Sequence, residues 1–315
     1  MVMKMEKIRI VFMGTADFSK AVLEMLIAEN YNIVGVVSQP DRPVGRKHIL
    51  KPTLVKEVAL EHQLPCIQPE KIKTDYQAIL DLKPDLIITA AYGQIVPKAI
   101  LEAPRLGCIN VHASLLPKLR GGAPVHHAII DGYQETGVTI MYMASKMDAG
   151  DMLANVKTAI SQDDNVGILY ERLTILGKDL LKDILPMFIE GKLNAVKQDE
   201  AEVTYAPTIT REEEHIYFDK TVDEVERHVR GLTPWPSAYA VYQGENIKIW
   251  KGHGIKDYVY AKPGTIMQID KTGIYVACQD GLYCIEELQV PGKKRMSIKD
   301  YLNGRNQFML NAYFE

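Results

Sequence analysis

The chain has 315 residues, of which 47% are apolar and 24% are charged, and its formal net charge is −3. This length is sufficient for two domains with sizeable cores, and the composition is that of an ordinary globular protein. The charge excludes a globally basic nucleic-acid-binding protein, so any nucleic-acid partner has to be met by a local basic patch.

The first two thirds of the chain alternate short apolar runs with helical patterns. Strands are predicted at residues 7–13, 32–37, 86–89, 107–112, 137–143 and 152–159. Helices are predicted at residues 17–29, 53–62, 76–82 and 165–189, the first of them capped by Asp17. Strands that alternate with helices are typical of a parallel sheet covered on both faces. The pattern therefore predicts an α/β fold whose first domain is Rossmann-like and doubly wound.

The chain changes character after residue 191. A connector over residues 194–211 leads into one short predicted helix at residues 222–230. Short β-like runs follow at residues 237–242, 247–250, 264–270, 273–277 and 282–288, separated by Gly, Pro and Asp. Several short strands with turn residues between them predict a small β-barrel. We therefore divide the chain into a first domain at residues 1–193, a linker at 194–211 and a C-terminal barrel at 212–315.

No metal site, membrane span or secretory signal is evident in the sequence. The four cysteines have neither Cys-x-x-Cys spacing nor a neighbouring cluster of histidines, which a zinc site would need. No run of about 18 apolar residues occurs, and the apolar run near the N-terminus is short and contains Arg9. We expect a soluble, cytoplasmic protein that binds no metal and no membrane.

A polar pair closes the strand predicted at residues 107–112. Asn110 and His112 are two positions apart, so on an extended strand they point to the same face. The carboxyl ends of strands are where open α/β sheets bind ligands. An amide can stabilise a developing oxyanion, and an imidazole can move a proton near neutral pH. The pair predicts acyl-type transfer; a turn-forming Asn beside a His bonded to its neighbours is the structural alternative.

Three other loops have ordinary structural interpretations. Residues 14–18 follow the first strand but contain a single glycine, which makes a dinucleotide site a poor interpretation. Residues 89–97 are apolar enough to form the wall of a pocket, although ordinary packing between a strand and a helix accounts for most of that character. Residues 147–151 form a plain turn by composition, because Asp and Gly tolerate turn geometry.

Two segments carry an excess of basic side chains. Residues 42–56 contain five Lys or Arg residues and no carboxylate, and Pro40, Pro43 and Gly45 disfavour regular structure at the start. Residues 227–315 contain 12 Lys or Arg residues against 8 Asp or Glu residues, with the densest cluster at residues 293–295. Both segments suit contact with a nucleic-acid backbone, and a solvated surface is the alternative for each.

Four ordered motifs together resemble the folate-dependent formyltransferases. They are SQPDRPVGR at residues 38–46, NVHASLLP at 110–117 with RGGAP at 120–124, MDAGDM at 147–152, and TPWP at 233–236. The resemblance is clear from residue 8 to about residue 250 and fainter beyond. Within the family, the chain looks most similar to the branch that formylates methionyl-tRNA.

The resemblance implies a reaction and a set of site residues. The formyl donor would be 10-formyltetrahydrofolate, the acceptor would be the α-amine of initiator methionyl-tRNA, and no metal would take part. Asn110, His112 and Asp148 would be catalytic, with Asp148 orienting the imidazole or holding a water. Folate would be contacted by Tyr92, Gly93, Ser114, Leu115, Leu116 and Pro117. The tRNA would be contacted by Arg42, Arg46, Lys47 and Lys51 of the basic loop and by Lys293, Lys294 and Arg295 of an OB-like barrel.

The sequence departs from the family pattern at two places. Lys47-His48-Ile49 stands where the family commonly has Gly-Lys-Lys, and Thr208 stands where it often has Lys. The main alternative is a formyltransferase of the same fold that acts on a small amine, such as an amino-sugar nucleotide. A non-catalytic RNA-binding protein that kept the fold is a second alternative. We expect the protein to be a monomer.

Overall fold

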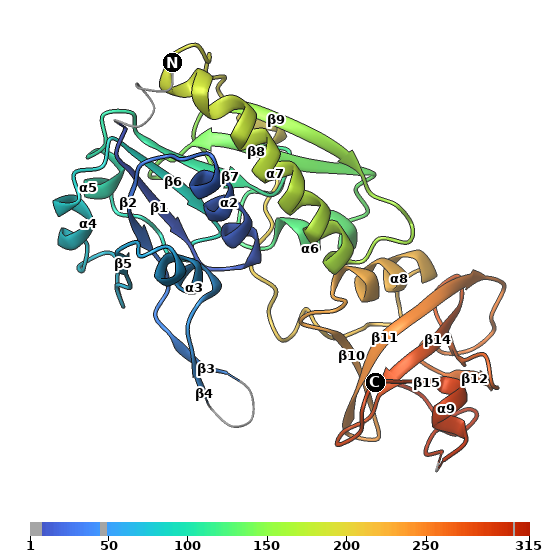
Figure 1. Cartoon of the computed structure of the whole chain (residues 1–315). Helices are drawn as coiled ribbons and strands as arrows, with labels where there is room; N and C mark the ends of the chain where they lie inside the picture. The colour runs from blue at the N-terminus through green and yellow to red at the C-terminus, as the bar shows by residue number, and fades with distance from the viewer. Residues whose placement is uncertain (1–7, 45–48, 305) are drawn as a thin grey trace. The chain divides into compact units, whose positions relative to one another are not determined.

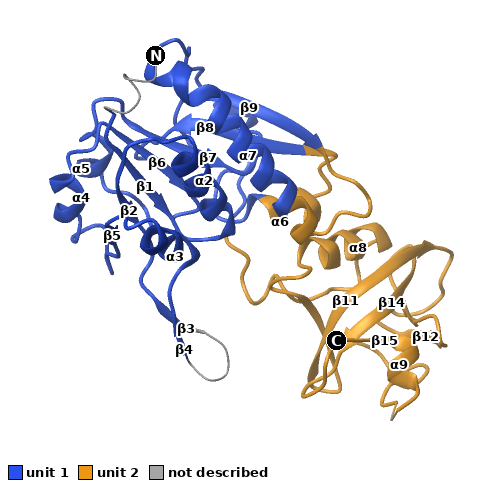
Figure 2. Ribbon diagram, viewed as in Figure 1, with its two compact units in different colours: residues 1–124, 136–158, 170–207 blue, residues 125–135, 159–169, 208–315 orange. Residues whose placement is uncertain are grey.

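The computed structural model of the chain describes residues 8–44, 49–304 and 306–315. These residues form two compact units (Figure 2). The first consists of residues up to 124, 136–158 and 170–207, and the second of residues 125–135, 159–169 and 208–315. Within the described part of the chain, no helix is both long enough and apolar enough to cross a membrane.

The first unit is built on a seven-stranded sheet with the order β5-β2-β1-β6-β7-β8-β9 (Figure 1). Five strands are parallel: β1 (Ile10–Gly14), β2 (Ile33–Val37), β5 (Cys66–Ile67), β6 (Leu86–Ala90) and β7 (Cys108–His112). β8 (Glu135–Tyr142) pairs antiparallel to β7, and β9 (Met152–Ala159) follows at the edge. The chain reverses its winding direction between β1 and β6, as in a doubly wound sheet. The predicted Rossmann-like α/β domain is confirmed.

Helices cover both faces of this sheet. They are α2 (Asp17–Ala28), α3 (Leu54–Glu61), α4 (Gln77–Asp81), α5 (Lys98–Leu101) and most of α7 (Val166–Ile189), whereas α6 (Pro124–Ile130) falls almost entirely in the second unit. On one face Ile79 of α4 and Ile100 of α5 join a core cluster with Cys108 of β7. On the other, α7 approaches β7 closely because Gly177 has no Cβ, which would lie 3.2 Å from Val111. Side chains alternate along a strand, so Asn110 and His112 continue the face of Cys108.

Two local predictions about the first unit are wrong. Asp17 does not cap α2: the N-cap position is Ala16, without a side-chain bond, and Asp17 lies in the first helical turn, where a carboxylate complements the helix dipole. The basic segment is not irregular at its start, since β3 (Arg42–Val44) pairs antiparallel with β4 (Ile49–Lys51). Pro43 is tolerated there because the ribbon has only two strands, and an edge position does not need every N–H.

The second unit contains an antiparallel sheet with the order β10-β11-β14-β13-β12. The strands are β10 (Ala238–Tyr242), β11 (Glu245–Lys256), β12 (Ile266–Ile269), β13 (Ile274–Ala277), β14 (Gly281–Gln289) and β15 (Met296–Ser297), which pairs with β14. The C-terminal residues reach both edges: Ile266 N donates to Ala312 O, and Glu315 N donates to Val241 O, each at 2.8 Å. This bridging closes the sheet in the manner of a small barrel.

Two helices accompany this sheet, α8 (Val222–Gly231) and α9 (Ile298–Leu302). α8 begins with a capping box between Thr221 and Glu224, which satisfies two N–H groups that the first turn leaves free. Val222, Val225 and Val229 of α8 lie in the core cluster of the unit. α8 is therefore held by its apolar stripe as well as by its cap.

Candidate active site

The site begins where β6 and β7 end side by side. Thr89 and Asn110 are paired in the strand register, and Thr89 Oγ1 donates to Asn110 Oδ1 at 2.8 Å. The amide oxygen of Asn110 is thereby turned toward β6. Its Nδ2 group has no hydrogen-bond partner among the residues that the structure describes. Asn110 therefore presents an oriented N–H donor at the strand end.

His112 is buried, with 6% of its surface exposed, and both of its ring nitrogens face oxygen atoms. Nε2 lies 3.1 Å from the carbonyl oxygen of Leu119, and Nδ1 lies 3.7 Å from Oδ2 of Asp148. A carbonyl oxygen can only accept, so Nε2 carries a hydrogen. Nδ1 is then the nitrogen that can take up and release a proton.

Asp148 is brought to His112 by a turn of unusual backbone conformation. Its φ of 50° lies in the left-handed region, which Asp tolerates better than most residues. Its carboxylate also accepts a hydrogen bond from the main-chain N–H of Gly121 at 2.9 Å. The turn predicted at residues 147–151 is present, and it aims a carboxylate at the imidazole.

A side chain that the sequence did not point to, Gln198, contacts the same turn. Gln198 Nε2 donates to the carbonyl oxygens of Asp148 and Gly150, both at 2.8 Å. Gln198 Oε1 accepts from Arg120, which is 1% exposed and also pairs with Glu200 at 2.8 Å. Gln198 lies in the stretch predicted as a linker and belongs to no recognisable motif, so no signal in the sequence marks it.

Glu200 is the carboxylate that compensates the buried Arg120. It also accepts from Lys146 Nζ at 2.8 Å. The hydrogen bonds from Arg120 and Lys146 lower the pKa of Glu200 to about 2. The group is therefore ionised throughout the range in which an enzyme works.

The residues expected to contact folate lie in the loops after β6 and β7. Tyr92 is 5% exposed, and its hydroxyl has no hydrogen-bond partner among the described residues; burial raises its pKa to about 12. Gly93 has a φ of 92°, which favours glycine. Tyr92 and Gly93 follow β6 and residues 114–117 follow β7, so the two loops begin at adjacent strand ends.

The second loop, residues 114–117, is held by its own polar groups. The Ser114 hydroxyl is buried and donates to Lys118 O at 2.7 Å. Leu116 N donates to Thr139 Oγ1 at 3.1 Å, and the Leu116–Pro117 peptide bond is cis. Leu116 is buried, whereas Leu115 and Pro117 are half-buried. The Ser114 hydroxyl therefore serves the loop itself.

The predicted basic loop is a hairpin tied down at its base. Lys56 Nζ donates to Asp41 at 2.6 Å, and hydrogen bonds from Gln68 and Lys56 lower the pKa of Asp41. Arg42 pairs with Glu70 at 2.9 Å, with both side chains well exposed. Lys51 is exposed opposite Arg42 in the β3–β4 register. Arg46 and Lys47 lie outside the described residues.

The basic cluster of the second unit is divided between paired and unpaired cations. Arg295 Nη2 lies 2.5 Å from Glu287, and the guanidinium packs over Trp250 at 5.1 Å from the ring centroid. Lys293 and Lys294 are exposed and form no ion pair within the described residues. In this cluster the cations without an ion pair among the described residues are therefore Lys293 and Lys294.

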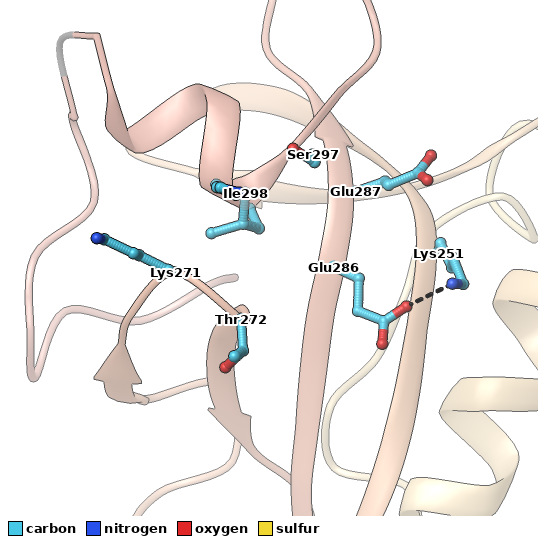
Figure 3. A pocket seen from close by; sticks show the side chains of 8 residues that line it. Lys251, Lys271, Thr272, Glu286, Glu287, Ser297 and Ile298 are labelled. Atoms are coloured by element: carbon cyan, nitrogen blue, oxygen red, sulfur yellow. Dashed lines mark ion pairs between the residues drawn. The ribbon is translucent and has the colours of Figure 1, made fainter.

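A pocket of the second unit has Glu287 in its lining. It is lined by three lysines, Lys251, Lys271 and Lys299, and by two glutamates (Figure 3). Lys251 is bound to Glu286 at 3.0 Å, while Lys271 lies on the opposite side of the pocket (Figure 3). The pocket belongs to the barrel and contains none of the residues around His112.

Comparison with known proteins covers almost the whole chain. The family described as formyl transferase matches residues 7–185, and the family described as formyl transferase, C-terminal domain, matches residues 208–306. The chain is 50% identical over 299 residues to methionyl-tRNA formyltransferase of Bacillus subtilis (strain 168), covering 94% of each chain. It is 50% identical over 302 residues to the protein of that name from Enterococcus faecalis (strain ATCC 700802 / V583), covering 95% and 96%.

Solved structures share the fold at lower identity. An N-formyltransferase from Helicobacter canadensis, in complex with folinic acid and dTDP-3-aminofucose, is 19% identical with a TM-score of 0.66, covering 88% of this chain and 98% of that one. HypX from Aquifex aeolicus, in complex with tetrahydrofolic acid, is 18% identical with a TM-score of 0.63, covering 93% of this chain and 46% of that one.

Proposed function

The chain belongs to the methionyl-tRNA formyltransferase family, and from this premise we propose that it transfers a formyl group from 10-formyltetrahydrofolate to the α-amine of initiator methionyl-tRNA in the cytoplasm. The observation that carries the proposal is that Asn110 and His112 share one face at the end of β7, with the Asp148 carboxylate 3.7 Å from the His112 ring. The relatives align over nearly their full length, which supports the whole activity rather than a part of it.

Asn110 is the residue that we assign to the oxyanion. When the amine attacks the formyl carbon, the formyl oxygen becomes negatively charged and needs a donor that is already in place. Thr89 holds the amide oxygen, so the Nδ2 group keeps its orientation without reorganising. One such donor typically contributes a factor of about 10² to 10³ in kcat.

His112 is the residue that we assign to the proton. The attacking nitrogen has to lose a proton, and N10 of the folate has to gain one as it leaves. Because Nε2 is bonded to the Leu119 carbonyl, Nδ1 carries this proton, and Asp148 opposite it compensates the positive charge. No covalent enzyme intermediate is needed, since the amine is itself the nucleophile.

We assign substrate binding to the loops around this centre. The folate would be held by Tyr92 and Gly93 and by residues 114–117, with Ser114 acting through its main chain because its hydroxyl is bonded to Lys118. Contacts to the tRNA backbone are assigned to basic side chains of both units: Arg42, Arg46, Lys47, Lys51, Lys293, Lys294 and Arg295. Since Arg295 is already paired with Glu287, Lys293 and Lys294 supply most of the charge in their cluster.

The test is a transfer assay with 10-formyltetrahydrofolate and three acceptors: methionyl-tRNA, free methionine and an amino-sugar nucleotide. We expect rapid formylation of methionyl-tRNA alone. Free methionine has the same amine without the nucleic acid, so it reports what the tRNA contacts contribute. Preferential formylation of the sugar nucleotide would overturn the proposal in favour of a small-amine formyltransferase.

A further inference from the structure

Three consecutive residues connect the members of the candidate site. Leu119 O faces His112 Nε2, Arg120 binds Gln198, and Gly121 N donates to Asp148. We propose that Gln198 is a positioning residue for the transfer reaction: it holds the main chain of residues 148–150 so that the Asp148 carboxylate faces His112. The inference rests on the proposed function, because it deepens the account of the same site.

The contacts of Gln198 restrain the turn at two points. A primary amide has two N–H groups, and Gln198 directs them to two different carbonyl oxygens, those of Asp148 and Gly150. The turn also lies directly against the end of β8: a Cβ at Gly150 would collide with the carbonyl oxygen of Tyr142. The left-handed conformation of Asp148 is less favoured for a residue with a side chain, and these contacts hold it.

The chemistry of the contacts specifies glutamine. The carbonyl oxygens of the turn can only accept hydrogen bonds, and the guanidinium of Arg120 can only donate them. Gln198 satisfies both, with Oε1 accepting from Arg120 Nε at 3.0 Å and Nη2 at 2.8 Å. A glutamate could accept from Arg120 but could not donate to the turn, and an apolar side chain could do neither.

The anchor of Gln198, Arg120, is itself held by several contacts. Arg120 is buried and pairs with Glu200. Its main chain is bonded on both sides to the segment that carries Gln198, since Arg120 N donates to Thr204 O at 2.9 Å and Ala206 N donates to Arg120 O at 2.7 Å. The stretch from Gln198 to Ala206 is therefore part of the structure that shapes the site.

The test is a double-mutant cycle on the full chain. Gln198→Met keeps the length of the side chain and removes both sets of hydrogen bonds. We expect kcat for methionyl-tRNA to fall about 10-fold or more while KM for 10-formyltetrahydrofolate stays within about twofold, because alignment and not binding is lost. In an Asp148→Asn background the same change should lower kcat by less than about twofold, since Gln198 acts through Asp148.

Two further variants separate positioning from general damage. Lys197→Met places the same new side chain at the adjacent exposed position and should leave kcat unchanged. Gln198→Glu keeps an acceptor for Arg120 and loses the donors to the turn, so it should lose kcat as Gln198→Met does. The inference is overturned if both Gln198 variants keep wild-type kcat, or if Gln198→Met is as damaging without the Asp148 carboxylate as with it.

Hydrogen exchange supplies a readout that does not depend on catalysis. The Gly121 N–H is bonded to the Asp148 carboxylate, so its exchange should accelerate in Gln198→Met and stay slow in Lys197→Met. Unchanged exchange in Gln198→Met would also overturn the inference. Transfer to methionyl-tRNA by the wild type tests the proposed function by itself, so the two failures are distinguishable.

Discussion

Each ring nitrogen of His112 has a neighbour that determines its role. One nitrogen is bonded to the Leu119 carbonyl and the other faces Asp148. We predict that replacing His112 or Asp148 by Ala lowers kcat by about 10² or more, because both act on the transition state. The measurement is steady-state transfer to methionyl-tRNA, with circular dichroism to show that folding is kept. Full activity of His112→Ala would remove it from the mechanism.

Thr89 offers a sharper test of the Asn110 assignment. Thr89→Val keeps the shape of the side chain and removes the hydrogen bond that fixes the Asn110 amide. We predict a decrease in kcat of about 10-fold, since the oxyanion donor is no longer preorganised. Thr89→Ser retains the hydroxyl and should stay within about twofold of the wild type. Equal kcat for the valine and serine variants would contradict a role of the amide's orientation.

At the scale of elements, we expect the β3–β4 hairpin to serve tRNA binding without taking part in folate binding. Arg42 lies on this hairpin, whereas the expected folate residues follow β6 and β7. We predict that Arg42→Leu lowers kcat/KM for methionyl-tRNA at least about 10-fold and that Arg42→Lys restores it in part, because Lys cannot bind phosphate in a bidentate manner. Affinity for a folate analogue, measured by calorimetry, should not change.

Glu70 is the matched control for this prediction. It pairs with Arg42 at the surface, where such a pair contributes little to stability. Glu70→Gln frees the guanidinium without removing it, so transfer to tRNA should be kept or improved. A loss of folate affinity in Arg42→Leu would show that the hairpin shapes the catalytic pocket.

Helix α8 makes the second unit sensitive to acid through His228. Burial, which outweighs a backbone hydrogen bond at Glu214, lowers the pKa of His228 to about 4. At neutral pH the ring is neutral in both the folded and unfolded chain. Below about pH 6.5 the unfolded chain takes up a proton that the folded chain does not, so the free energy of unfolding decreases down to about pH 4.

We predict that, between pH 7 and pH 5, the free energy of unfolding decreases by about 2 kcal/mol more in the wild type than in His228→Gln. Urea unfolding followed by tryptophan fluorescence is a suitable measurement, because both tryptophans, Trp235 and Trp250, lie in the second unit. The difference between variant and wild type should be the same at pH 7 and pH 8. An equal loss in both proteins on acidification would contradict burial as the cause.

The elements that the sequence predicted well are those with a clear apolar pattern. The strands around residues 10, 35, 88 and 110 follow short apolar runs, and the helix at residues 165–189 follows a long helical periodicity. The short helices α5 and α6 span four and seven residues, too few for a periodic pattern to be seen. The β3–β4 hairpin was missed because Pro40 and Pro43 indicate a break, although an edge ribbon tolerates Pro43.

At the scale of the whole molecule, the candidate site combines local and distant residues. Asn110 and His112 could be predicted together because strand geometry relates neighbours two apart. Asp148 could be placed with them only through the family resemblance. Gln198 could not be predicted, because its role comes from two carbonyl oxygens 48 and 50 residues away, and main-chain acceptors leave no trace in a sequence.

The distribution of charge over the whole molecule leads to a prediction about salt. The chain is slightly acidic overall, so binding of tRNA has to come from local clusters whose contacts release counterions. We predict that log affinity for tRNA falls linearly with log salt concentration, and that Lys293→Ala with Lys294→Ala reduces the slope by about 2, one for each phosphate contact. Filter binding between about 50 and 200 mM salt measures this slope.

Lys98→Ala is the control. It removes an exposed lysine of α5 that pairs with Glu102, and it should leave the slope unchanged. A slope that is flat in the wild type would contradict backbone binding and favour a small-molecule acceptor; a slope unaffected by the paired lysine substitutions would place the tRNA contacts elsewhere on the chain.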